Sequence, residues 1–214
     1  MPWIKVGAAV VVVAQQFNPS IVTQLWLSRN AGMRDEDFLA GCVFTDLIVQ
    51  IRSRQFHMLV VPEQMQFLPL EAEEQQIIHE KLGAIVGSLP HTPYRAVGLN
   101  FTWHLSTQRT MPEVSREMFF RTDRALYQNF TDAGAHFGAY LSKDSSGFRL
   151  KLDVKPVLVQ LEDRTEHRLQ FAFNFHRDFT ENHTAQLEQC LLLWDAAKRE
   201  VETIIDSVER REEP

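Results

Sequence analysis

Apolar and polar residues follow each other along the first part of the chain in patterns that predict strands and one helix. The valine-rich stretch 3–15 has no turn-forming residue after Gly7 and predicts a buried strand. Apolar residues at helical spacing then predict a helix over 21–30. Two stretches rich in β-branched and aromatic residues, 43–52 and 55–67, predict the two strands of a hairpin.

Two further segments extend this pattern. One apolar stripe at helical spacing predicts a helix over 71–89, and proline at position 90 ends it. The strict alternation of residues 94–105 predicts a strand with two different faces. The resulting order, βαββαβ, resembles that of a ferredoxin-like unit.

The second part of the chain carries a shorter version of the same theme. Residues 136–142 and 148–160 predict a β-hairpin around a polar turn, and 167–176 predicts a strand with three phenylalanines on one face. No helix breaker occurs from Thr184 to about Arg210, so the pattern predicts one long C-terminal helix.

These elements together predict an α+β fold. We expect an antiparallel or mixed sheet with helices on one side, with the ferredoxin-like order in the first half. A β-hairpin, a further strand and the long C-terminal helix would form the second half. Residues 1–214 are expected to form a single domain, and two topologically similar halves, 3–89 and 93–210, are an alternative that no residue-level repeat supports.

The C-terminal segment has a heptad-like apolar pattern. Such a seam is typical of a helix laid across a sheet, and it is also found where a helix pairs with a partner chain. Both interpretations stay open from the sequence. The residues of this candidate binding seam are Leu187, Leu191, Trp194, Val201, Ile205 and Val208.

The strand over 94–105 offers a second candidate surface. Its apolar face carries Phe101 and Trp103, which are expected in the core, while its other face is small and polar. Asn100 and Thr102 lie on that polar face and are candidates for binding a small ligand. RNA binding would need stacked aromatic and basic residues on an exposed sheet face, and the aromatic residues here are on the wrong side.

Composition and charge limit the possible partners. The net charge of −6 argues against nucleic-acid or membrane-surface binding, which uses a basic face. No stretch approaches the roughly 20 apolar residues of a membrane span. The two cysteines, Cys42 and Cys190, favour free thiols in a reducing compartment, so a cytoplasmic location is expected.

Local chemical motifs are missing from the sequence. It has no glycine-rich phosphate loop, no nucleophile elbow, and no cysteine or histidine pair at the spacing of zinc ligands. We therefore expect neither a cofactor nor a metal.

Histidines give the one remaining indication of catalysis. His104, His136 and His176 lie on or beside predicted strands, and imidazoles that converge could act as acid and base in a hydrolytic or nucleolytic enzyme. Scattered histidines at strand ends explain the same pattern without any site.

The sequence as a whole favours a cytosolic protein-interaction or scaffold module rather than an enzyme. We expect its contact surface to be the C-terminal helix or an exposed sheet edge, with a protein partner or a second copy of the chain. The histidine enzyme and a small-ligand or RNA-binding protein are the alternatives.

Overall fold

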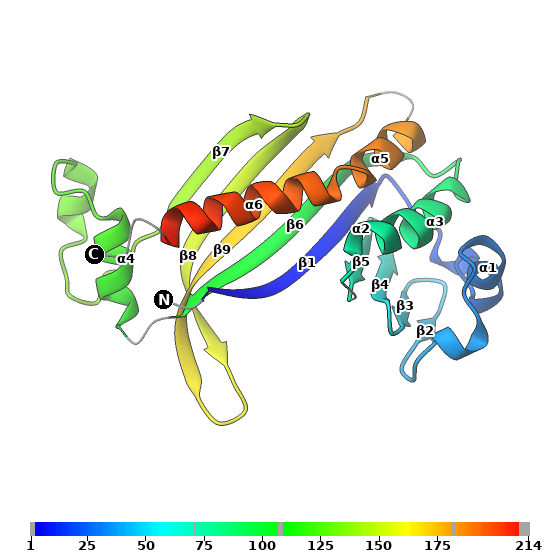
Figure 1. The fold of residues 1–214 in the computed structure, drawn as a ribbon, viewed down its shortest axis with the longest axis horizontal. Coiled ribbons are helices and arrows are strands. Elements are labelled where there is room, and N and C mark those ends of the chain that lie inside the picture. The colour runs from blue at the N-terminus through cyan, green and yellow to red at the C-terminus, as the bar shows by residue number, and fades with distance from the viewer. Residues whose placement is uncertain (1–2, 71, 107–108, 181–182, 210–214) are drawn as a thin grey trace.

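The computed structural model describes residues 3–70, 72–106, 109–180 and 183–209. Its described strands form one antiparallel sheet in the order β2-β3-β4-β5-β1-β6-β9-β8-β7 (Figure 1). The strands are β1 (Trp3–Ala14), β2 (Val43–Phe44), β3 (Val49–Arg52), β4 (Phe56–Val61), β5 (Gln64–Pro69), β6 (Tyr94–Ser106), β7 (Ala139–Ser145), β8 (Phe148–Gln160) and β9 (Thr165–Asp178).

Helices α2, α3, α5 and α6 lie over one face of this sheet (Figure 1). The α-helices are α1 (Gln24–Asn30), α2 (Glu74–Ile77), α3 (Ala84–Gly87), α4 (Met111–Phe119), α5 (His183–Leu191) and α6 (Trp194–Glu209). Shorter helical turns are η1 (Pro19–Ile21), η2 (Asp35–Asp37) and η4 (Ala125–Asn129), and η3 (Ile78–Gly83) is π-helical. Because α2, η3 and α3 follow one another without a gap, we call them helix 74–87.

The core fills the space between these helices and the sheet. Phe101 of β6 packs against Phe175 of β9 and against Trp194 of α6, with ring centroids 6.1 Å and 4.6 Å apart. The three residues are almost completely buried. The alternation within β6 and β9 places their large apolar residues on this face. On the opposite face Asn100, Thr102 and Asn174 stay partly exposed.

The expected order βαββαβ is wrong. Four strands, β2 to β5, separate α1 from helix 74–87, where the pattern predicts two. The stretch 43–52 is divided by a turn at residues 45–48, in which the Thr45 hydroxyl accepts hydrogen bonds from the backbone N–H groups of Leu47 and Ile48. The stretch 55–67 is divided between β4 and β5 at Pro62, which cannot donate to a ladder.

The expected long C-terminal helix is also wrong. Helix α5 ends at Leu191 and α6 begins at Trp194, so two helices occupy the segment, and Arg210 lies outside the described residues. Gln75 of α2 forms hydrogen bonds to backbone groups on both sides of this break. The expected single domain over 1–214 stays a prediction.

None of the helices in the described ranges is long and apolar enough to cross a lipid bilayer.

Candidate functional site

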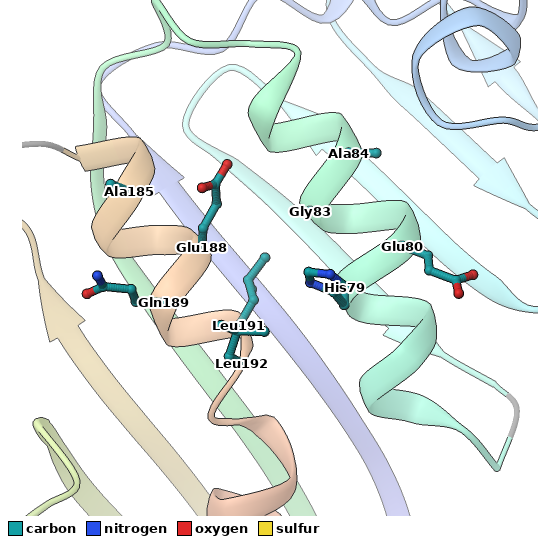
Figure 2. Close-up of a pocket in the computed structure, with 9 residues that line it drawn as sticks. All are labelled: His79, Glu80, Gly83, Ala84, Ala185, Glu188, Gln189, Leu191 and Leu192. Carbon is teal, nitrogen blue, oxygen red and sulfur yellow. The ribbon is translucent and has the colours of Figure 1, made fainter.

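A groove runs between helix 74–87 and the pair α5 and α6. One part of it has a volume of about 630 Å³ and adjoins a second part of about 450 Å³; His79 and Leu192 line both. Figure 2 shows the first part, with His79 and Glu188 extending toward the space between the two helices. The lining residues are His79, Glu80, Gly83, Ala84, Ala185, Glu188, Gln189, Leu191 and Leu192 in the first part, and Ala72, Glu73, Glu74, Gln75, Gln76, His79, Leu192 and Asp195 in the second.

The wall formed by helix 74–87 has an unusual local geometry. Residues Ile78–Gly83 are π-helical, so the backbone is wider there than in a regular α-helix. Ile78 and Leu82 are fully buried, while His79 and Glu80 are exposed; in Figure 2 the His79 ring points toward α5 and the Glu80 side chain points away from it. Short π-helical segments are frequent at functional sites.

Glu74, at one end of the groove, links three elements through its carboxylate. Its carboxylate accepts hydrogen bonds from Lys5 Nζ at 2.6 Å and from Trp194 Nε1 at 3.0 Å, and it pairs with Lys198 Nζ at 3.1 Å. Burial raises the pKa of Glu74, but these three donors outweigh burial and hold the pKa below its usual value. The carboxylate therefore joins β1, α2 and α6.

Gln75 holds the junction between α5 and α6. Its side-chain Nε2 donates to the carbonyl of Leu191 at 2.9 Å, and its Oε1 accepts from the backbone N–H of Asp195 at 3.1 Å. These two backbone groups lie at the end of one helix and the start of the next, where intrahelical partners are missing. The Gln75 amide thus stabilises the break that shapes this end of the groove.

The groove is acidic. Glu73, Glu80, Glu188 and Asp195 line it, and none of these four forms an ion pair within the described chain. The nearby Lys81 forms no ion pair with them in the described chain; its Nζ donates to the carbonyl of Ala31 at 3.1 Å. The exposed carboxylates consequently give the groove a negative field.

Apolar groups accompany these carboxylates. Leu192, in the break between α5 and α6, is 57% exposed, and Ala84 and Ala185 lie on opposite walls. Aliphatic surface beside unpaired charge is typical of contact surfaces for other macromolecules.

Two of the three candidate catalytic histidines, His104 and His176, lie far apart. His104 pairs with Gln170 and His176 pairs with Gly98 in the β6–β9 ladder, so six residues separate the two histidines along the strands. At 3.3–3.4 Å per residue that separation is roughly 20 Å, well beyond the reach of acid–base partners. His136 is exposed in the segment before β7. The structure therefore does not bring all three histidines together, because His104 and His176 lie apart.

His176 and His104 each have a polar neighbour within the chain. His176 Nε2 lies 3.1 Å from Asp178 Oδ1. His104 is 6% exposed, its Nε2 lies 3.4 Å from Gln170 Oε1, and its Nδ1 has no hydrogen-bond partner. Burial lowers the pKa of His104, and the charge of Arg168 adds to this, while the hydrogen bond with Gln170 acts in the opposite direction.

The apolar seam predicted for the C-terminal segment faces the protein's own core. Leu187, Leu191, Trp194, Val201 and Ile205 are each at most 3% exposed, and Val208 is partly buried. These side chains pack within the chain and do not offer a surface to a partner.

The polar face of β6 is partly engaged as well. Asn100 Oδ1 accepts a hydrogen bond from Asn174 Nδ2 at 2.7 Å, and its Nδ2 lies 3.4 Å from the carbonyl of Gly98. Thr102 is partly exposed beside it. No group of three or more potential metal ligands occurs in the ranges that the structure describes.

Apart from Leu191, the groove residues were not among the candidates from sequence. The polar positions of the two helices repeat at helical spacing, as in Gln76 and Glu80 or Thr184 and Glu188, and that signal marks an exposed helix face. It does not say that the two faces border one groove, because that depends on how the helices pack on the sheet.

Comparisons of the chain with protein-family models, with curated proteins and with solved structures give no match.

Proposed function

We propose that this protein is an interaction module that binds a lysine- or arginine-rich segment of a partner protein in the groove between helix 74–87 and α5. The observation that carries the proposal is the set of groove carboxylates that have no counter-ion in the described chain. A cationic segment would supply that charge, and charge complementarity of this kind favours one partner over others and speeds association.

The form of the groove favours a peptide segment over a small molecule. Small-molecule sites usually enclose most of the ligand's surface. Here His79, Glu80, Glu188 and Leu192 are all exposed, so the groove is open along its length. Leu192 and the two alanines would contact the apolar side chains that accompany basic residues in an amphipathic helix.

Charge reversal in the groove tests this proposal. The probe is a synthetic amphipathic peptide with lysines on one face and leucines on the other, and its partner peptide has glutamates in place of the lysines. The double variant Glu80→Lys and Glu188→Lys replaces one carboxylate on each of the two helices that border the groove with a cation. We expect the affinity for the basic peptide to fall about tenfold or more, because like charges then face each other.

A matched control variant has the same net charge as the groove variant. Glu63→Lys and Asp206→Lys change two exposed carboxylates that lie outside the groove. Calorimetry at low and at physiological salt should show this control within about twofold of the original protein. Equal losses in both double variants, or equal binding of the acidic peptide, would show a nonspecific charge effect and contradict the proposal.

The natural partner can be sought at the same surface. A photo-crosslinking residue in place of Gln189, which is exposed on the groove, should capture a segment rich in lysine and arginine. The Glu80→Lys and Glu188→Lys substitutions should abolish that capture. A captured segment that is acidic, or whose capture persists in the double variant, would contradict the proposed chemistry.

A further inference from the structure

The hairpin of β8 and β9 extends beyond the rest of the sheet (Figure 1). The last residue of β8 paired with β7 is Val154, and the outermost residue of β9 paired with β6 is Arg168. From there to the turn the two strands pair only with each other among the described residues, as in Leu158 with His167 and Gln160 with Thr165. We call residues 155–168 the arm.

The outer edge of β8 in the arm has no paired strand in the described chain beyond its base, where Gly138 packs beside Val154 and Lys155. Residues 155–160 have no strand on that side among the described residues. Natural proteins usually protect such edges with charges or by making them short. The edge strand β2 has only two residues, and the edge strand β7 carries the charged residues Lys143 and Asp144. Residues 157–159 of the arm, in contrast, are Val-Leu-Val. Leu158 is 65% exposed.

The phase of the ladder determines which backbone groups point outward. Pro156 has no N–H, so we expect its pair with Leu169 to be one of the non-hydrogen-bonded pairs of the β8–β9 ladder. Hydrogen-bonded and non-hydrogen-bonded pairs alternate along an antiparallel ladder. Leu158, two residues after Pro156, is therefore also in a non-hydrogen-bonded pair with β9. The N–H and C=O of Leu158 are therefore expected to point toward the free edge, where they can bond to another strand.

Charge along the arm is self-complementary. Lys155 lies at its base, where its Nζ pairs with Asp153 Oδ2 at 2.8 Å, and Glu162 and Asp163 lie at its tip; Lys155, Glu162 and Asp163 are exposed. When two copies of this edge pair antiparallel about a two-fold axis at Leu158, the base of each arm lies beside the tip of the other. Lys155 of one copy then approaches Glu162 of the second copy, and the same contact occurs twice.

We propose that two copies of this chain associate through the outer edge of β8 at residues 155–160, in a two-fold antiparallel pair that continues the sheet from one copy into the other. This surface is separate from the groove, because α3 and α5 lie near the opposite end of the sheet from the arm (Figure 1). The association therefore leaves the groove of each copy free.

Sedimentation velocity over a range of protein concentrations tests this proposal. We expect a species of twice 24.8 kDa whose share rises with concentration. Leu158→Pro removes one outward N–H from each copy and, in the phase described above, no hydrogen bond within the hairpin. It should raise the dimer dissociation constant at least about 30-fold, as expected for the loss of two hydrogen bonds. Leu158→Ala keeps the backbone donor and should retain the dimer.

A charge exchange tests the register. Glu162→Lys with Asp163→Lys should weaken the dimer, and adding Lys155→Glu should restore it. Thermal melts show whether each variant is folded, and hydrogen exchange of residues 155–162 should slow as protein concentration rises. A single 24.8 kDa species at about 0.5 mM would overturn the proposal, since even a weak interface is occupied at that concentration. A dimer unchanged by Leu158→Pro would also overturn it.

Discussion

His104 is a buried histidine whose second ring nitrogen has no partner, so its protonation should affect folding. Its pKa is lowered by burial in the native state, whereas the unfolded chain gives it an ordinary value of about 6.5. Above that pH the ring is neutral in both states. As the pH falls below it, the unfolded state takes up a proton first, so stability is lost between the unfolded and the native pKa.

We therefore expect the free energy of unfolding to fall from pH 7.5 to pH 5.5, with a contribution from His104 no steeper than about 1.4 kcal/mol per pH unit. His104→Gln removes this titration while keeping a group that can bond to Gln170. Urea denaturation of both proteins across this range isolates the effect of His104, because the other seven histidines are common to both. Parallel pH profiles would show that His104 does not titrate differently on folding.

At the scale of elements, the junction of α5 and α6 depends on a side chain from helix 74–87. Gln75 satisfies the Leu191 carbonyl and the Asp195 N–H across a sequence separation of 116 to 120 residues. Gln75→Ala would leave both groups without this partner at a partly buried site. We expect a loss of about 1–3 kcal/mol in the free energy of unfolding, measured by urea denaturation.

Gln76→Ala is the neighbouring control. Gln76 is exposed and, within the described ranges, its side chain bonds only to Glu80, at 2.8 Å, so its loss should cost no more than about 0.5 kcal/mol. Equal costs for the two substitutions would contradict a special role for Gln75. In the Gln75→Ala variant, hydrogen exchange should also speed up at residues 191–195 before it does elsewhere in α6.

This junction also shows where sequence reasoning stops. Leu191, Leu192 and Leu193 favour a helix, and no glycine or proline marks a break, so local residues predict one continuous helix. Gln75 provides the compensating hydrogen bonds from a distant element, which periodicity cannot reveal. The divided strands are a different case, since Thr45 and Pro62 are local turn signals present in the sequence.

The candidate site also combines features that local sequence predicts with features that depend on tertiary packing. Alternation in β6 predicts that Phe101 is in the core and Asn100 on the other face, and the structure shows both. The distance between His104 and His176 could not be predicted, because it depends on the β6–β9 register. The groove depends likewise on how two helices, far apart in sequence, pack on one sheet.

At the scale of the whole molecule, the sheet separates two surfaces. The groove lies on its helix-covered face, and the arm lies at the opposite end of the sheet (Figure 1). A two-fold pair of arms would present two grooves, and two linked sites bind a partner with two basic segments more tightly than one site does. This arrangement is what we expect of an interaction module that assembles partners.

The most direct test of the central claim is an NMR titration of the isotope-labelled protein with the basic amphipathic peptide. Shift changes should concentrate in residues 72–84 and 185–195, which contain the groove lining, and should weaken with added salt. The glutamate peptide should produce no such pattern. Changes centred on the arm or on the polar face of β6, or no saturable change at low salt, would contradict the groove as the binding site.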